Sequence, residues 1–114
     1  MASRSSPAAP LRGDMQAMAR HAEAAAQLLK SLAHPERLLV LCRLVEGEAS
    51  VSELQEQSSL SMSALSQHLA VLRDAGLVDT RREAQSIFYS LVDSPAIGVL
   101  QALHDSYCGK GKRR

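Results

Sequence analysis

Residues 61–91 read SMSALSQHLAVLRDAGLVDTRREAQSIFYSL, and this stretch decides the expected fold. Ser61 has the side chain of a helix N-cap, and Gly76 suits the left-handed conformation that ends a helix. Two strand-like runs follow, about Val78 to Arg82 and Ile87 to Val92, with a polar turn between them. The stretch therefore predicts a capped helix followed at once by a β-hairpin, or wing.

The polar edge of this helix predicts that the protein reads DNA. Leu65, Leu69 and Leu72 are spaced to face a core, which leaves short hydrogen-bonding side chains on the outer face. Such a helix can enter the major groove, while hairpin arginines meet phosphate or the minor groove. The predicted DNA-binding residues are Ser61, Ser63, Ser66, Gln67, His68, Arg81, Arg82 and Gln85.

These residues are not equivalent. The amide of Gln67 can pair with adenine through two hydrogen bonds, so it is the favoured base contact. His68 has two open roles, a DNA contact and a contact with the wing. Arg81 and Arg82 are neighbours on a strand and point to opposite sides, so only one of them can face DNA directly.

The rest of the chain predicts four further helices. Their apolar residues recur at helical spacing, and in the second helix they form a band of Leu38, Leu39, Leu41, Cys42 and Val45. The four helices are expected at Asp14 to Leu32, from Pro35 to about Gly47, at Ser52 to Gln57 with Ser52 as the cap, and from Ser94 onward. The expected fold class is mainly α with a β-hairpin wing.

Length and composition indicate one small domain. The chain has 114 residues, 46% of them hydrophobic and 3% aromatic, which suits a helical core of Leu, Val and Ala. We expect a disordered arm at residues 1–12, the folded domain at 13–108 and a basic tail at 109–114. No apolar run is long enough for a signal peptide or a membrane span, so a cytoplasmic protein without a membrane partner is expected.

Charge does not argue for DNA binding. Thirteen basic and twelve acidic residues give a net charge of +1, and three arginines are matched by three acidic residues within residues 61–91. DNA affinity should therefore depend on geometry and dimerisation, with a moderate dependence on salt.

Two other classes of protein fit the residues less well. A thiol-exchange enzyme would place its cysteines close together, as in C-x-x-C, whereas Cys42 and Cys108 are far apart and no cofactor loop or acid–base pair accompanies them. An interaction module built on the same fold would not need the polar helix edge. We therefore expect no enzymatic activity.

Three stretches resemble the ArsR/SmtB family of bacterial winged helix-turn-helix repressors. They are LLKSLAHPERLLVL at 28–41, LSQHLAVLRDAGLV at 65–78 and TRREAQSIFYSL at 80–91. The resemblance implies a homodimer built from the first and last helices, with one recognition helix for each half of a palindromic operator. It also implies that an inducer releases the DNA.

The residues do not match the metal sites of this family. The thiolate box of its arsenic and lead sensors corresponds to EASVSEL at 48–54, where Ser50 and Ser52 replace the cysteines, and serine is a poor ligand for soft metals. The last helix has only His104 and Asp105, which are adjacent and lack a second pair. We expect no metal site and no cofactor.

Cys42 and Cys108 resemble the cysteine pair of the persulfide-responsive BigR/SqrR-type branch. In that branch, reactive sulfur species (persulfide or polysulfide) bridge the two cysteines with a chain of sulfur atoms, and the same redox role is expected here. His104 precedes Cys108 by one helical turn, so Cys108 is expected to attack, while the apolar neighbours of Cys42 should raise its pKa. A buried structural Cys42 and a repressor that senses metal ions or general oxidants remain the alternatives.

Overall fold

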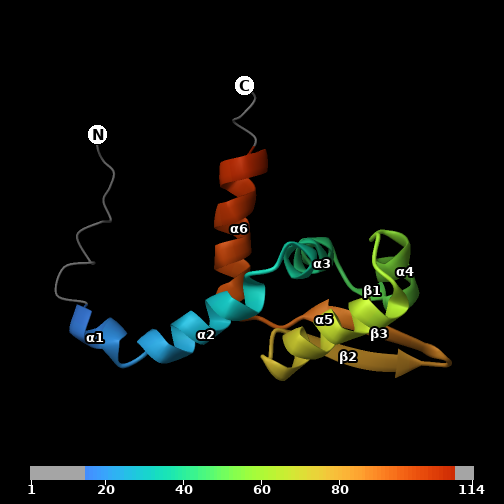
Figure 1. The fold of residues 1–114 in the computed structure, drawn as a ribbon, viewed down its shortest axis with the longest axis horizontal. Helices are drawn as coiled ribbons and strands as arrows, with labels where there is room; N and C mark the ends of the chain where they lie inside the picture. Colours follow the sequence, from blue (N-terminus) through green and yellow to red (C-terminus); the bar gives the residue numbers. More distant parts are fainter. Residues whose placement is uncertain (1–14, 110–114) are drawn as a thin grey trace. The chain divides into compact units, whose positions relative to one another are not determined.

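In a computed structural model, the protein is described for residues 15–109 and divides into two compact units, Met1–Lys30 and Ser31–Arg114. The predicted arm and the tail beyond residue 109 lie outside the described residues, and the predicted domain boundaries remain predictions. The elements follow in the order α1 (Met15–Ala19), α2 (Ala22–Leu32), α3 (Pro35–Val45), β1 (Ala49–Ser50), α4 (Val51–Glu56), α5 (Met62–Asp74), β2 (Val78–Glu83), β3 (Ser86–Leu91) and α6 (Pro95–Cys108) (Figure 1). Of these helices, none has both the length and the apolar character needed to span a bilayer.

The first predicted helix is broken into α1 and α2. The N–H groups of Arg20 and His21 donate to carbonyls three residues back, at 3.3 and 2.8 Å, which is the bond pattern of a tight turn. Met15 and Met18 are 81% and 57% exposed, so burial does not hold this segment in one straight helix. Asp14, the first residue of the predicted helix, lies outside the described residues.

α3 begins at Pro35 as predicted, but its buried face differs from the predicted band. The buried residues are Val40, Leu41 and Leu44, whereas Leu39 is 63% exposed. Cys42 and Val45, also placed in the band, are exposed. The band was right for Leu41 and wrong for Leu39, Cys42 and Val45, because most residues of this helix are apolar and composition does not show which stripe faces the neighbouring helices.

α4 begins one residue earlier than predicted, and its cap is Ser50 rather than Ser52. The Ser50 hydroxyl accepts from the Glu53 N–H at 3.1 Å, and the Glu53 carboxylate accepts from the Ser50 N–H at 2.8 Å. Both serines match the pattern of a capping box. The box formed by Ser50 uses the carboxylate of Glu53, whereas a box formed by Ser52 would use the amide of Gln55. A charged carboxylate accepts a stronger hydrogen bond than a neutral amide does.

α5 has the ends and the buried face that the sequence predicts. The Ser61 hydroxyl accepts from the Ala64 N–H at 3.1 Å, and Gly76 adopts a φ of 75° after the last turn. The apolar core of the described residues consists of Leu, Val and Ala and contains no aromatic residue, as the composition indicated. Its members are Leu32, Val40, Leu41, Leu44, Ala49, Leu54, Leu65, Leu69, Leu72, Leu77, Val78, Ala96 and Leu100.

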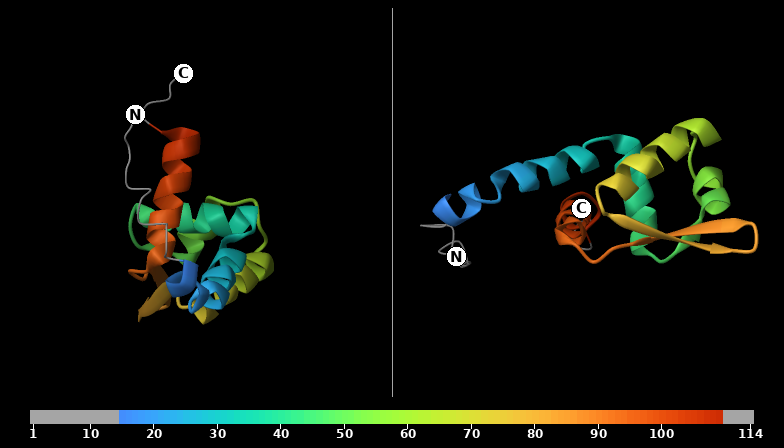
Figure 2. Two further views of the ribbon diagram at one scale, coloured as in Figure 1. Left: turned by 90° about the vertical axis from the view of Figure 1, so that its left-hand side faces the viewer. Right: turned by 90° about the horizontal axis from the view of Figure 1, so that it is seen from below.

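The wing belongs to an antiparallel sheet with the strand order β1-β3-β2. Pairing continues to Glu83 opposite Ser86, so the turn contains only Ala84 and Gln85 and is shorter than predicted. β1 adds a two-residue pairing with β3, in which Ala49 lies opposite Tyr89 and Ser50 opposite Phe88. Figure 2 shows that the hairpin projects beyond the helices of its unit, which makes it accessible to a partner.

The conformation of Ala84 gives a test of the turn. Its φ of 57° is disfavoured for a residue with a Cβ but accessible to glycine. Ala84→Gly should raise the free energy of unfolding by about 0.5–1 kcal/mol. This is the energetic cost of the left-handed conformation for alanine minus the additional conformational entropy that glycine loses on folding. Chemical denaturation measures the change.

The matched control is the same substitution within a helix. Ala70 is exposed in the middle of α5, so Ala70→Gly should lower the free energy of unfolding by about 1 kcal/mol. A loss of stability in both variants would show that the strain assigned to Ala84 is absent.

Candidate DNA-reading surface and dithiol pocket

The outer face of α5 presents the predicted base-reading side chains. Ser61, Ser63, Ser66 and Gln67 are exposed, because Leu65, Leu69 and Leu72 on the opposite face are buried at 2% exposure or less. Small polar groups on a helix whose other face is fixed in a core are suited to close approach to a base edge. The surface is therefore available for the role that the sequence predicts.

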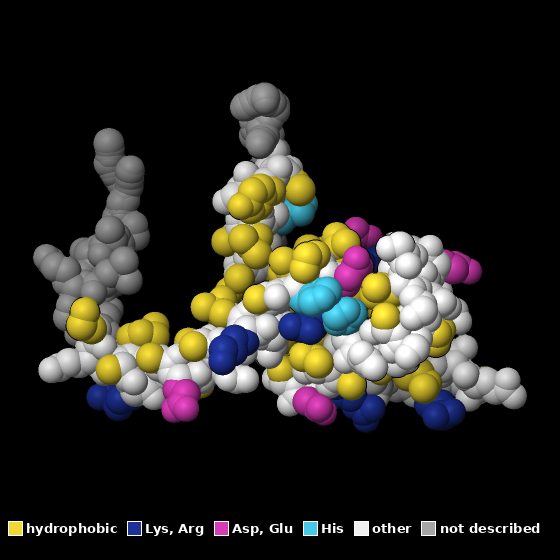
Figure 3. Space-filling model, viewed as in Figure 1, with side chains coloured by type: hydrophobic (Ala, Val, Ile, Leu, Met, Phe, Trp, Pro, Cys, Tyr) yellow, Lys and Arg dark blue, Asp and Glu magenta, His cyan; other side chains and the backbone are white. Residues whose placement is uncertain are grey.

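His68 is held against the start of α3. Its ring centroid lies 4.3 Å from that of His34, and Nη1 of Arg37 lies 3.4 Å from His68 Nδ1. Figure 3 shows adjacent histidine side chains at the surface. His34 is itself the N-cap of α3, since its Nδ1 accepts from the Glu36 N–H at 3.1 Å. His68 thus ties α5 to α3, a role beside the two that the sequence left open.

This setting lowers the pKa of His68. Burial is the largest cause, followed by the positive charges of His34 and Arg37, while Glu36 acts in the opposite direction. The neutral imidazole is therefore favoured where α3 and α5 meet.

Arg81 is engaged by two carboxylates. Its Nε and Nη2 donate to Glu48 at 2.7 and 2.9 Å, its Nη1 donates to Glu83 at 2.8 Å, and its guanidinium lies 4.6 Å from the centre of the Phe88 ring. The hydrogen bonds from Arg81 lower the pKa of Glu48, and those to Glu48 and Glu83 raise the pKa of Arg81. Sequence reasoning missed Glu48, because no pattern links it to a strand so far along the chain.

Arg82 lies on the other side of the hairpin. It pairs with Ile87, and opposite residues of an antiparallel pair share a face. Ile87 lines one pocket together with Ser66 of α5, and Gln85 at the turn lines it too. Arg82 is therefore on the side of the sheet that faces α5, and it is the better placed of the two arginines for a phosphate contact.

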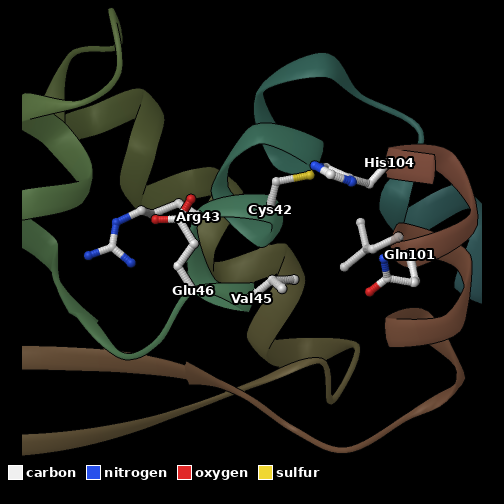
Figure 4. Close-up of a pocket in the computed structure, with 7 residues that line it drawn as sticks. Cys42, Arg43, Val45, Glu46, Gln101 and His104 are labelled. Atoms are coloured by element: carbon white, nitrogen blue, oxygen red, sulfur yellow. The ribbon is translucent and has the colours of Figure 1, made fainter. Parts of the chain in front are cut away.

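A second pocket, of about 370 Å³, lies between α3 and α6. It is lined by Cys42, Arg43, Val45, Glu46, Leu100, Gln101 and His104. Figure 4 shows the Cys42 sulfur and the His104 ring directed toward one another from the two helices. Sequence reasoning placed His104 beside Cys108 by helical spacing and had no signal for its position opposite Cys42.

The two cysteines lie within electrostatic reach of one another. Both thiols are free and exposed, Cys42 on α3 and Cys108 at the end of α6. The pKa of Cys42 is raised, first by burial and then by the charge of Cys108. A raised pKa of Cys42 agrees with the sequence prediction, although the Cys42 side chain is only partly covered and not buried.

The described residues 15–109 contain no group of three His, Cys, Asp or Glu side chains that could hold a metal ion. His104 Nδ1 lies 4.0 Å from Asp105 Oδ1, and this pair has no third partner of those kinds within the described chain. Ser50, at one position of the family's thiolate box, is occupied in capping α4.

The lowered pKa of His68 predicts a pH dependence of stability. The unfolded chain binds this proton more tightly than the folded chain, so the free energy of unfolding should fall as the pH drops below the ordinary histidine value of about 6.5. His68→Gln should weaken this fall. Denaturation at a series of pH values measures the slope.

His21→Gln is the matched control, because His21 is exposed in the turn before α2. That variant should keep the slope of the original protein. An unchanged slope in His68→Gln would contradict the role assigned to the His34–His68 contact.

Comparison with known proteins agrees with a winged-helix fold and a DNA-binding surface on α5. Residues 34–80 match the family described as bacterial regulatory protein, arsR family. The biofilm growth-associated repressor of Xylella fastidiosa is 45% identical over 96 residues, which are 84% of this chain and 84% of the relative. The transcriptional activator HlyU of Vibrio cholerae is 46% identical over 95 residues, 83% of this chain and 88% of that protein.

A solved structure confirms the fold. The transcriptional repressor BigR from Xylella fastidiosa superimposes with a TM-score of 0.77 at 45% identity, covering 82% of this chain and 95% of that one. The resemblance to the winged-helix family and to its BigR type, predicted from the sequence, is thereby confirmed. The chain belongs to the ArsR family of bacterial regulatory proteins and is a DNA-binding, winged-helix regulator of transcription.

Proposed function

We propose that the protein is a homodimeric repressor that leaves a palindromic operator when persulfide or polysulfide bridges Cys42 and Cys108. The observation that carries the proposal is the placement of two free, exposed thiols on the packed helices α3 and α6, where the charge of Cys108 influences the pKa of Cys42 although the two residues lie far apart in the sequence. A pair of accessible thiols is what a reversible sulfur bridge requires. The similarity to BigR, a repressor, supports the same assignment.

Exposed apolar residues support the dimer. On α6, Leu103 is 38% exposed and Tyr107 is 79% exposed, and Figure 3 shows hydrophobic side chains gathered along this helix. On α1 and α2, Met15, Met18 and Leu29 are more than half exposed. Apolar helix faces of this kind are usually covered by a partner, and a two-fold dimer covers both copies at once.

The bridge forms by steps in which atoms and charge balance. The Cys108 thiolate attacks the outer sulfur of a persulfide RSSH, which forms Cys108–S–SH and releases the thiolate RS⁻. A second RSSH extends this to Cys108–S–S–SH in the same way. Cys42 then attacks the middle sulfur, so that a trisulfide joins the two cysteines and HS⁻ leaves.

The position of the bridge supports an effect on DNA. α3 packs against α6 on one side and against α5, which presents the reading surface, on another. A covalent link between α3 and α6 therefore restrains the helix on which α5 rests. We propose that the restraint changes the spacing of the two recognition helices in the dimer.

Cysteine variants test the sensing step. Cys42→Ser and Cys108→Ser should bind operator DNA like the original protein when reduced, because neither residue lies on the reading surface. Neither should release DNA on treatment with glutathione persulfide. Fluorescence anisotropy with a palindromic promoter fragment measures release, and mass spectrometry of the original protein should show one extra sulfur atom between the two cysteines.

Hydrogen peroxide and zinc are the comparison treatments. Release by peroxide with a plain disulfide would favour a general oxidant sensor, and release by zinc from the reduced dimer would favour a metal sensor. Because HlyU is named an activator, transcription of the fragment in vitro decides the sign of the regulation, and repression by the reduced protein is expected.

The wing arginines give a test of the DNA interface. Arg82→Ala should weaken binding and lower the slope of log affinity against log salt by about 0.9, the value for one lost phosphate contact. Arg81→Ala is the control, because Arg81 is engaged by Glu48 and Glu83, and it should leave that slope unchanged. If Arg81→Ala changed the slope more than Arg82→Ala does, Arg81 and not Arg82 would be the phosphate contact.

A further inference from the structure

We infer that His104 accepts the proton of the Cys42 thiol in the step that closes the sulfur bridge. The inference rests on the proposed function and adds to it a residue that the two-cysteine chemistry does not itself require.

The arrangement of the pocket brings His104 to the reacting sulfur. Cys42 on α3 and His104 on α6 line the same pocket, and the imidazole ring is directed at the sulfur (Figure 4). His104 and Cys108 are four residues apart on α6, so they share one face of that helix. The imidazole therefore lies on the face of α6 that carries Cys108, from which the sulfur bridge extends.

Cys42 needs a proton acceptor. Burial and the charge of Cys108 raise the pKa of Cys42, so the thiol is mostly protonated near neutral pH. A thiol is a far weaker nucleophile than a thiolate, and a nearby base that takes the proton during attack removes this obstacle. Cys108 attacks first in this scheme, which leaves Cys42 as the thiol to be activated.

The step can be written with every atom placed. As Cys42 attacks the middle sulfur of Cys108–S–S–SH, its proton passes to an imidazole nitrogen of His104. The bond between the middle and the terminal sulfur breaks, and the electron pair leaves with HS⁻. The imidazolium then gives the proton to this anion, so that hydrogen sulfide departs and His104 is neutral again.

The charged groups around His104 are compatible with this cycle. Glu46 lines the pocket from α3, and Asp105 Oδ1 lies 4.0 Å from His104 Nδ1 on α6. When His104 takes the proton, the Asp105 carboxylate at 4.0 Å is a partner for its positive charge. Arg43 also lines the pocket, but it donates to Gln57 at 3.0 Å and to the Gly47 carbonyl at 3.1 Å, which directs its charge elsewhere.

The test is the pH dependence of bridge closure in the full chain. Reduced protein is mixed with glutathione persulfide at a series of pH values, samples are quenched by alkylation, and mass spectrometry follows the Cys108 persulfide and the bridged product. Closure in His104→Gln should be about 100-fold slower near neutral pH, at the low end of general base catalysis. The pH profile of closure should also change in the variant, while persulfide still forms on Cys108.

Controls separate this inference from the proposed function. His104 has a side chain that is 59% exposed, so the variant should fold, and a thermal melt checks this. His21→Gln should keep the original rate and pH profile. Closure in His104→Gln with an unchanged rate and profile would overturn the role of His104 and leave the sensing mechanism standing. Absence of any bridge in the original protein would overturn the proposed function itself.

Discussion

The packing of α3 against both α5 and α6 is the constraint on which the rest of the structure depends. Leu41 and Leu44 of α3 are at most 3% exposed, as are the core leucines of α5 and Leu100 of α6. Burial of each such side chain contributes roughly 1.5–3 kcal/mol. Because protein interiors are packed as densely as organic crystals, α3 cannot move against one neighbour without disturbing the other.

The two candidate functional surfaces involve different neighbours of α3. The candidate reading surface is the polar face of α5 with the wing beside it, and the pocket that contains Cys42 and His104 lies between α3 and α6. Cys42 and Cys108 are exposed and therefore lie at the edge of the core instead of inside it. The core between the two surfaces is apolar, and the described residues leave no buried side-chain nitrogen or oxygen atom without a hydrogen-bond partner. Restraint at one surface can therefore reach the other through rigid packing.

Most of the fold could be predicted because local signals agreed with tertiary packing. Ser61 and Gly76 set the ends of α5, and the leucine spacing fixed its buried face. Local signals failed where two residues, or two faces of a helix, fitted the same sequence pattern equally well. Ser50 and Ser52 both fit a capping box, and the mostly apolar sequence of α3 did not show which of its stripes would be buried.

The candidate sites were predictable as sets of residues but not as arrangements. The sequence indicated that one wing arginine would face DNA, yet it did not show that Glu48 would engage Arg81. It placed His104 by helical spacing next to Cys108, whereas the direction of the His104 ring toward Cys42 depends on how α6 lies against α3 (Figure 4). Such pairings join distant parts of the chain and are decided by tertiary packing.

The most direct measurement is the response of the α5 core when the sulfur bridge forms. Methyl NMR of the reduced and bridged protein would follow Leu65, Leu69 and Leu72, which are buried and carry no reactive group. The account predicts that bridging Cys42 to Cys108 shifts these methyl signals along with those of Leu100 on α6, in parallel with the loss of DNA affinity. A bridged protein that loses DNA affinity while the α5 methyl signals stay unchanged would contradict transmission through α3.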